Sequence, residues 1–273
     1  MDLESYFIKQ FEDKIIGDDG ALVDGFIYSK DAFFENVHFK KEWLTYKEIA
    51  TKAMLVNISD AFAMGAKPLY ALLSVAMPKD ITKQEAKELA KGFNQVAKKY
   101  GIKIIGGDTI SNTKLDITIT IISKTKKPLF RKGLKQNHLL AYTGVLGDSQ
   151  KDLKKLFSGK KVYKNSKFKA PILRDRFIFT CKKYFSCGMD ISDGLFSDLE
   201  KLHKINKLGF FFFRAIKKEI GCSGEEYEMV FGFDKRYKKA IISKAKQTRT
   251  PITIFAQARR KSYKNRCKRH HFG

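Results

Sequence analysis

Aspartate residues recur in short turns that also contain glycine or serine, and this recurrence is the chemically informative feature of the sequence. Turn geometry alone explains any single example, because Asx turns and left-handed glycines form such bends. Mg²⁺, however, prefers carboxylate and carbonyl oxygens, and glycines let backbone N–H groups approach phosphates. If the turns converge, they predict a magnesium–nucleotide site. The turns are Gly17-Asp18-Asp19, Ser29-Lys30-Asp31, Asn57-Ile58-Ser59-Asp60, Gly106-Gly107-Asp108-Thr109, Gly147-Asp148-Ser149 and Asp190-Ile191-Ser192-Asp193-Gly194.

Other ways of binding phosphate or driving catalysis are missing from the sequence. It contains neither a GxxxxGK[ST] loop nor a GxGxxG fingerprint, and the segment GVLG at residues 144–147 fits neither pattern. None of the five histidines belongs to an evident triad with Ser, Cys or Asp. The acidic turns are therefore the main candidates for chemistry.

Length and composition set the class of protein. The chain has 273 residues, of which 43% are hydrophobic and 30% charged, so we expect a globular protein of one large or two modest domains. No apolar run is long enough for a membrane span. The segment MDLESYFIKQFEDK at the start is acidic and amphipathic, unlike a secretory signal, and predicts a cytoplasmic location.

The net charge of +25 favours polyanionic partners, namely nucleic acid, an anionic membrane surface or phosphorylated small molecules. It does not choose among them. The four cysteines, at positions 181, 187, 222 and 267, show no CxxC spacing. We expect them to be reduced and to bind no zinc.

Helical and strand patterns alternate along the chain. Helices are predicted over residues 46–64 and over 82–100, the latter with a capping box of Thr82 and Glu85 and a C-terminal Gly101. Further helices are expected at 172–185, 195–206 and 236–247. Strands are expected around 21–31, 70–77, 102–105, 115–123, 139–143, 188–191, 210–213, 227–233 and 252–256.

This mixture lacks a strict βαβ rhythm, so the sequence predicts an α+β fold with sheets backed by helices. The basic and polar segment 124–138 is the predicted domain boundary. We expect an N-terminal nucleotide- and metal-binding domain over residues 1–128. A C-terminal domain over residues 129–273, ending in a basic tail, would close the substrate side.

Short motifs follow one another along the chain in a fixed order. They are GDDGAL at 17–22, Ser29 with Asp31, His38-Phe39, NISDAFAMGAKP at 57–68, GGDT at 106–109, TGVLGDS at 143–149, DISDG at 190–194 and GEEYEM at 224–229. In this order they resemble the thiamine-monophosphate kinase family, within the superfamily of aminoimidazole-ribonucleotide synthetase and selenophosphate synthetase. The resemblance spans about residues 15–233 and implies two mixed α/β domains of the aminoimidazole-ribonucleotide-synthetase type.

The resemblance implies direct transfer of the γ-phosphoryl group of ATP to the phosphate of thiamine monophosphate. The acceptor oxygen is already anionic near neutral pH, so no general base is needed, and positioning by several Mg²⁺ ions carries the reaction. It also implies a homodimer whose N-terminal sheets pair, with the nucleotide near that interface. ATP is then a co-substrate and Mg²⁺ the cofactor.

The resemblance assigns roles to individual residues. The implied metal ligands are Asp19, Ser29, Lys30, Asp31, Asp60, Asp108, Asp190 and Asp193. Of these, Asp31, Asp60 and Asp108 are the implied catalytic residues. The implied ATP contacts are Gly107, Asp108, Arg131 and Ser192, and the implied contacts to thiamine monophosphate are His38 and Glu225.

The chain departs from the family pattern at a few positions. Lys30 replaces the usual Thr, Ser223 the usual Gly and Glu226 the usual Asp. At Lys30 a ligand role can survive only through the backbone carbonyl. The region 206–223 is shorter than usual, and Tyr263 and Phe272 are the candidates for the family's C-terminal aromatic contact to thiamine.

Two alternatives stay open at this point. One is a sister enzyme of the superfamily acting on another substrate, although the first cysteine is Cys181, too late for the reactive cysteine of a selenophosphate synthetase. The other is a nucleic-acid-binding protein that uses the basic runs 151–169 and 259–271. We expect no specific nucleic-acid partner and no membrane partner.

Overall fold

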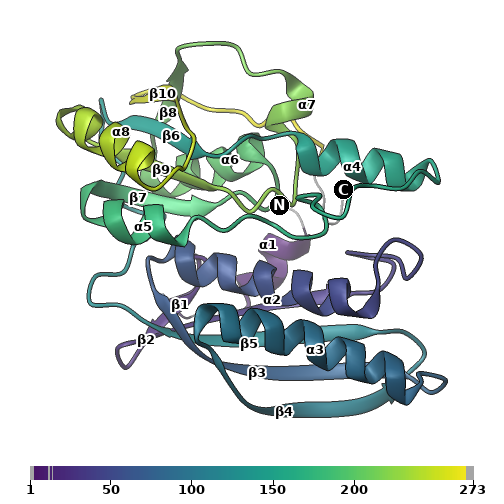
Figure 1. Cartoon of the computed structure of the whole chain (residues 1–273). Coiled ribbons are helices and arrows are strands. Elements are labelled where there is room, and N and C mark those ends of the chain that lie inside the picture. The colour runs from purple at the N-terminus through teal and green to yellow at the C-terminus, as the bar shows by residue number, and fades with distance from the viewer. Residues whose placement is uncertain (1–2, 12, 14, 269–273) are drawn as a thin grey trace.

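Two five-stranded sheets organise the computed structural model, which describes residues 3–11, 13 and 15–268. The first sheet has the order β1-β2-β5-β3-β4, and the second has the order β7-β9-β6-β10-β8 (Figure 1). The first comprises β1 (Ala21–Val23), β2 (Phe26–Phe34), β3 (Lys67–Pro78), β4 (Lys103–Asn112) and β5 (Asp116–Lys124). The second comprises β6 (Leu139–Thr143), β7 (Phe185–Asp190), β8 (Gly209–Phe212), β9 (Met229–Phe233) and β10 (Ile252–Arg259).

Helices back both sheets, which confirms the predicted mixed fold. The helices of the first half are α1 (Leu3–Ile8), α2 (Tyr46–Ala63) and α3 (Lys83–Tyr100). The helices of the second half are α4 (Asp148–Phe157), α5 (Asp175–Cys181), α6 (Leu195–Asn206), α7 (Lys218–Gly221) and α8 (Lys238–Gln247). A 3₁₀ turn at Lys182–Tyr184 follows α5, and another at Lys235–Tyr237 precedes α8. The helix expected over 172–185 is therefore shorter, and its last part is a 3₁₀ turn.

Local sequence explains the two long helices. The capping box of Thr82 and Glu85 is confirmed, and Thr45 with Glu48 forms a second one at the start of α2. Gly101 ends α3 in the left-handed conformation, which glycine adopts without a Cβ clash. Gly92 of α3 lies against the backbone of Lys47, and an added Cβ would collide with it. The two helices therefore pack closely on one face of the first sheet.

Helix α2 lies between the first sheet and the second half of the molecule (Figure 1). On one side it covers Ile117, Ile119 and Ile121 of β5, and on the other it reaches β7 and α5. Its residues are buried around nearly the whole circumference. One hydrophobic core thus extends from Phe33 in β2 to Phe231 in β9.

The opposite face of the first sheet is uncovered in the single chain. Strand register places Tyr28, Tyr70, Leu72 and Ile110 on this face, and they are 36–56% exposed. We call these four residues, with their neighbours on that face, the open face of the first sheet. Because contiguous exposed apolar surface marks interaction sites, it becomes relevant to assembly below.

The expectation of four reduced cysteines is wrong, because Cys222 and Cys267 form a disulfide. Their Cα atoms are 5.5 Å apart, within the range that permits a bridge. Their separation of 45 positions in the sequence hid this proximity. The described part of the tail contacts the second half, where Tyr263 donates a hydrogen bond to the Phe196 carbonyl. Cys181 and Cys187 are buried and free.

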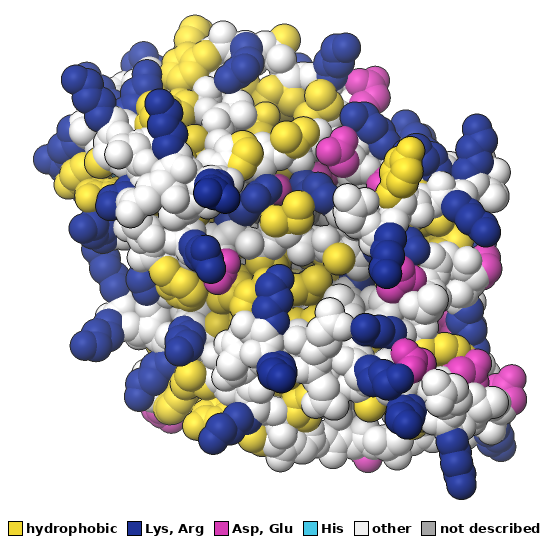
Figure 2. Space-filling model, in the orientation of Figure 1, with side chains coloured by type: hydrophobic (Ala, Val, Ile, Leu, Met, Phe, Trp, Pro, Cys, Tyr) yellow, Lys and Arg dark blue, Asp and Glu magenta, His cyan; other side chains and the backbone are white. Residues whose placement is uncertain are grey.

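Three of the six acidic segments predicted as turns lie wholly within helices or strands. Ser29-Lys30-Asp31 belongs to β2, Gly106–Thr109 to β4, and Asn57-Ile58-Ser59-Asp60 to α2. Within the described part of the chain, no helix is long and apolar enough to span a membrane. On the face seen in Figure 2, Lys and Arg side chains are spread over both halves rather than gathered in one stripe.

Candidate active site

Three aspartates from distant parts of the chain meet where the two halves face each other. Asp19 precedes β1, Asp60 lies in the last turn of α2, and Asp190 ends β7. Each offers one carboxylate oxygen, and these oxygens lie within 4.8 Å of one another. We call these three residues the acidic cluster. The sequence-based expectation that acidic segments converge is met for this set.

Burial and mutual repulsion disfavour the ionised forms of the acidic cluster in the absence of a cation. Burial and the charge of Asp19 raise the pKa of Asp190 well above its usual value. Burial and the nearby Asp31 and Asp190 do the same to the pKa of Asp60. Oδ2 of Asp19 is buried without a hydrogen-bond partner among the described residues. Because an unpaired buried carboxylate oxygen is costly, this arrangement fits a bound hard cation.

Asp31 adjoins the acidic cluster from β2. Burial, followed by the charges of Asp19 and Asp193, raises the pKa of Asp31 to about 6. Its backbone N–H donates a 2.8 Å hydrogen bond to the Asn57 side chain of α2, and the Ser29 hydroxyl donates to the Asn57 carbonyl at 3.5 Å. Asn57 therefore joins β2 to α2 beside the cluster, a role that its residue type alone did not reveal.

The Lys30 side chain does not face the acidic cluster. Successive residues of a strand point to opposite faces, and Lys30 is exposed on the open face while Ser29 is buried on the other. Only the backbone of Lys30 could act as a metal ligand there, as expected when Lys replaces Thr.

Arg131 is the cation that the structure places at the acidic cluster. Its guanidinium forms an ion pair with Oδ1 of Asp19 and donates to the Gly17 carbonyl at 3.1 Å. Its backbone N–H donates to Asp18 at 2.6 Å. Arg131 therefore ties the connection between the sheets to the GDDG segment, with its charge directed at the carboxylates.

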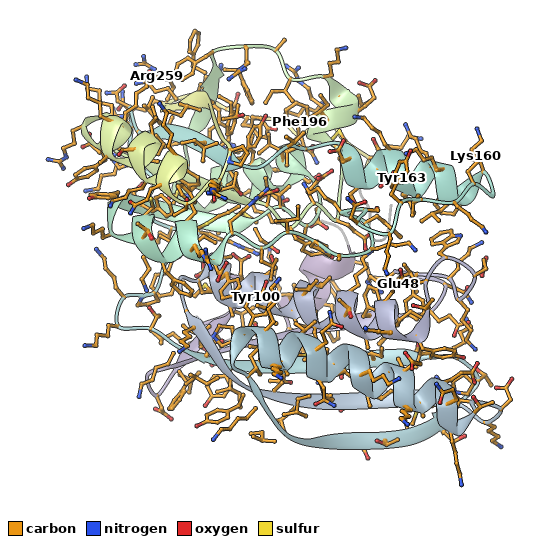
Figure 3. The ribbon with its side chains drawn as sticks, in the orientation of Figure 1. Glu48, Tyr100, Lys160, Tyr163, Phe196 and Arg259 are labelled. Atoms are coloured by element: carbon orange, nitrogen blue, oxygen red, sulfur yellow. A yellow bond between two sulfur atoms is a disulfide. The ribbon has the colours of Figure 1, made fainter. Side chains whose placement is uncertain are left out.

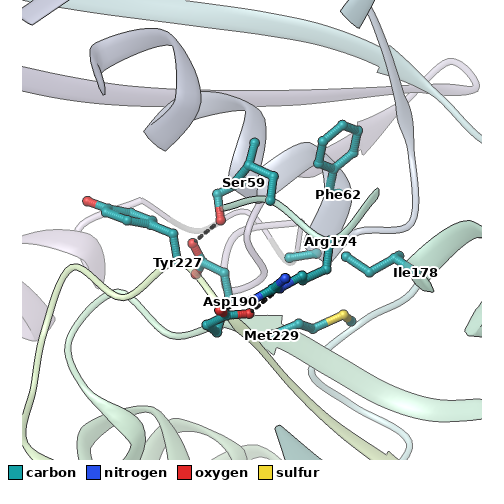
Figure 4. Close-up of a pocket in the computed structure, with 10 residues that line it drawn as sticks. Ser59, Phe62, Arg174, Ile178, Asp190, Tyr227 and Met229 are labelled. Atoms are coloured by element: carbon teal, nitrogen blue, oxygen red, sulfur yellow. Dashed lines mark hydrogen bonds and ion pairs between the residues drawn. The ribbon is translucent and has the colours of Figure 1, made fainter. Parts of the chain in front are cut away.

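Ser59 links α2 to the second sheet. Its hydroxyl donates a 2.7 Å hydrogen bond to Oδ2 of Asp190, and Figure 4 shows this bond with Tyr227 and Arg174 on either side. Both partners are buried. The bond favours the ionised form of Asp190 and so opposes the effect of burial on its pKa.

Asp193 of the DISDG segment and Asp198 of α6 form a second acidic pair. Lys201 of α6 donates to Asp193 at 2.6 Å and to Asp198 at 2.8 Å. Burial raises the pKa of Asp198 to about 6, and the Lys201 charge counteracts it. Ser192 contributes its carbonyl, which accepts a 2.7 Å hydrogen bond from the Glu225 N–H. The segment is thereby joined to the GEEYEM motif.

Asp108 is not brought to the acidic cluster of its own chain. In the strand register, Asp31 pairs with Ile119, Ile119 with Leu73, and Leu73 with Gly107, which separates Asp31 from Gly107 by three strand spacings, about 14 Å. Asp108 follows on the open face and is exposed. Gly107 itself packs so closely on the Leu73 backbone that a Cβ would clash.

His38 and Glu225 are connected by a series of contacts that includes the buried Lys52. His38 stacks on Phe33 with ring centroids 5.6 Å apart and accepts the Phe34 N–H at Nδ1, 2.9 Å away. Phe33 lies 5.7 Å from the ammonium of Lys52, and Lys52 donates to Glu225 at 3.1 Å. Sequence reasoning missed Lys52, because it is one of many lysines in the chain.

The rest of the GEEYEM motif is held by a buried ionic network. Glu226 accepts hydrogen bonds from the Gly147 N–H at 2.7 Å and the Ser223 hydroxyl at 2.5 Å. Glu228 accepts two from Arg174, at 2.7 and 2.9 Å, and Lys167 contacts both glutamates. The two departures Ser223 and Glu226 thus contact each other.

The proposed C-terminal aromatics are placed only in part. Tyr263 packs in the second half, with its ring 5.1 Å from that of Phe210. Phe272 lies outside the described residues.

In Figure 3, Lys160 and Tyr163 lie beyond α4 at the edge of the molecule, and Glu48 lies on α2, where it pairs with Lys169 at 3.0 Å.

Comparison with known proteins agrees with this arrangement. A family model described as AIR synthase related protein, N-terminal domain, matches residues 17–125, which include the whole first sheet. The fold and the acidic cluster thus define a protein of the AIR synthase-related class. The thiamine-monophosphate kinase of Nitrosopumilus maritimus is 32% identical over 224 residues, which cover 75% of this chain and 72% of that protein. The chain belongs to the thiamine-monophosphate kinase family.

Solved structures share the fold. The structure described as AaThiL complexed with AMPPCP and TMP matches with a TM-score of 0.85 and 23% identity, covering 96% of this chain and 91% of that one. The thiamine monophosphate kinase of Aquifex aeolicus matches with a TM-score of 0.83 over 94% of this chain and 92% of that one, at 23% identity. These structures confirm the predicted fold, and the relative from Nitrosopumilus maritimus confirms the family resemblance seen in the sequence.

Proposed function

We propose that this chain transfers the γ-phosphoryl group of ATP to the phosphate of thiamine monophosphate, giving thiamine diphosphate. The observation that carries the proposal is the acidic cluster with its unpartnered oxygen on Asp19, in a member of a family whose curated relatives are thiamine-monophosphate kinases. The related structure with AMPPCP and TMP supports the choice of both substrates.

Magnesium is the cofactor we propose. Asp19, Asp60 and Asp190 would hold it, because three converging carboxylates with raised pKa values match the preference of Mg²⁺ for anionic oxygens. Asp31, Asp193 and the backbone around Ser29 and Lys30 complete the proposed ligand set. When bound, Mg²⁺ neutralises charge between the two phosphate groups.

The residues of the chain position the substrates. Arg131 directs its guanidinium at the acidic cluster and is our proposed contact to ATP phosphates, together with Ser192 of the DISDG segment. We propose that Asp31 and Asp60 act with the metal as the catalytic carboxylates. His38 and Glu225 are our proposed contacts to thiamine monophosphate, on the side of α2 toward Lys52.

Asp108 and Gly107 require a second subunit in this proposal. Both lie on the edge strand β4, and Asp108 lies on the open face, where the exposed Tyr28 and Tyr70 support pairing of two chains. We propose a homodimer through the open face, with Asp108 and Gly107 near the nucleotide at the interface. We also keep residues 1–128 and 129–273 as the proposed domains, and we propose the cytosol as the location.

The test is direct. The purified protein is incubated with ATP, Mg²⁺ and thiamine monophosphate, and thiamine diphosphate is separated by chromatography. A parallel reaction with unphosphorylated thiamine tests the choice of acceptor. Formation of thiamine diphosphate only from the monophosphate is the expected result, and its absence at every Mg²⁺ concentration would reject the proposal.

A further inference from the structure

Lys52 is a fully buried lysine in the middle of α2. Its side chain is 0% exposed, and a lysine is rarely buried to this degree without a specific partner. Burial lowers its pKa, and the charge of Glu225 opposes that effect. A hydrophobic residue would fill this place without the free-energy cost of desolvating a charge. The presence of the ammonium group therefore indicates a specific role.

The contacts of Lys52 define an enclosed cation site. Its ammonium lies 3.5 Å from the ring centroid of Phe168 and 5.7 Å from that of Phe33, where the electron-rich ring faces attract a cation. Among the described residues, the carboxylate that it pairs with is Glu225, at 3.1 Å. Two aromatic rings and one carboxylate therefore fix the ammonium.

Glu225 occupies a conformation that needs support. Its φ is 54°, in the left-handed region that is unfavourable for a residue with a Cβ. Its N–H donates to the Ser192 carbonyl at 2.7 Å, and Lys52 holds its carboxylate from the buried side. The side chain remains 24% exposed, so Lys52 holds the carboxylate of Glu225 without the side chain being fully enclosed.

The Lys52 ammonium is also connected to His38, through the ring of Phe33. The Phe33 ring contacts the Lys52 ammonium and also stacks on His38. Lys52 is therefore shared by the two residues that we propose to face the acceptor. Asp60 lies eight residues further along the same helix, a rise of about 12 Å, so α2 sets the distance between the acidic cluster and this end of the site.

We propose that Lys52 is a positioning residue that fixes Glu225, and through Phe33 the His38 turn, for recognition of the phosphorylated acceptor. This inference rests on the proposed function. The bulk of the lysine stem packs the core in any case, whereas the ammonium group orients the carboxylate.

The experiment compares Lys52→Met, Glu225→Gln and the double variant, with Lys47→Met on the exposed side of the same helix as the matched control. We expect Lys52→Met to raise KM for thiamine monophosphate about tenfold while KM for ATP changes less than about twofold. Because both residues act through one carboxylate, the double variant should be no worse than Glu225→Gln alone. Lys47→Met should resemble the wild type.

A second measurement does not depend on activity. Amide hydrogen exchange of residues 221–229 should become faster in Lys52→Met and in Glu225→Gln, with exchange in α3 unchanged. If Lys52→Met does not fold, Glu225→Gln tests the same contact from the other side. An unchanged KM for the acceptor in folded Lys52→Met, additive losses in the double variant, or unchanged exchange in 221–229 would each overturn the inference. A wild-type protein that does not phosphorylate thiamine monophosphate rejects the proposed function instead, while the exchange result still decides whether Lys52 holds Glu225.

Discussion

The hydroxyl of Ser59 in α2 donates a 2.7 Å hydrogen bond to the carboxylate of Asp190 at the end of β7, across 131 residues of sequence. This bond connects the helix that covers the first sheet to the second sheet, at the point where the acidic cluster forms. Neighbouring residues of α2 thus serve two tasks, since Asp60 belongs to the cluster and Ser59 orients another member of it.

Ser59→Ala tests that connection. Removing the hydroxyl leaves Asp190 without a buried hydrogen bond, which we expect to cost about 1–3 kcal/mol of unfolding free energy and about tenfold in activity. Urea unfolding and steady-state kinetics measure the two effects. Ser59→Thr keeps a hydroxyl and should lose less, and equal losses in both variants would argue against a role for the hydrogen bond.

Asp19→Asn tests the acidic cluster as a cation site. The amide keeps the volume of the side chain but removes the charge of the carboxylate, whose Oδ2 lacks a hydrogen-bond partner. We expect the rise in melting temperature on adding Mg²⁺ to disappear and activity to fall by about a hundredfold. Asp24→Asn, in the exposed turn before β2, is the control. A normal Mg²⁺ response in Asp19→Asn would contradict the assignment.

Asp108→Asn separates the two parts of the proposed site. Because Asp108 lies on the open face, away from the acidic cluster of its own chain, its loss should lower activity about tenfold or more while the Mg²⁺-dependent rise in melting temperature of the cluster persists. Calorimetric melting with and without Mg²⁺ and an activity assay decide this. Near-normal activity would reject the role of Asp108, and a lost thermal response would reject the separation.

The pH dependence of stability follows from Asp31. Its pKa rises from 3.8 to about 6 on folding, so between these values the folded protein retains a proton that the unfolded chain releases. The stabilisation from this proton is complete below about pH 4 and is lost as pH rises through about 6. In cation-free buffer, the stability advantage of the wild type over Asp31→Asn should therefore shrink from pH 4 to pH 7, measured by thermal melting. Mg²⁺ should stabilise the wild type more at pH 7 than at pH 5, because ligation requires ionised carboxylates.

Reduction of the Cys222–Cys267 disulfide should destabilise the second half. A bridge that closes a loop of 45 residues contributes up to about 4 kcal/mol through the entropy of the unfolded chain. We expect a lower melting temperature in dithiothreitol, and no response to the reductant in the double variant Cys222→Ser with Cys267→Ser. Equal melting with and without reductant in the wild type would show that the bridge does not stabilise the fold.

Local patterns in the sequence were sufficient for most of the elements. The capping box of Thr82 and Glu85, the left-handed Gly101 and the strand over 139–143 appear as predicted, because each depends on residues near one another in the chain. The acidic segments were also recognisable, since carboxylates beside glycine and serine are readable at short range.

Which carboxylates meet depended on the tertiary structure. The sequence by itself determined that the chain is basic overall with acidic segments in a fixed order, and that order carries the family. Only the packing of α2 between the two sheets decided that Asp19, Asp60 and Asp190 converge, that Asp108 faces away, and that Lys52 finds Glu225. The physical reason is that these contacts join residues 41 to 173 positions apart in the chain. The packing of the layers brings these residues together, and no local spacing encodes it.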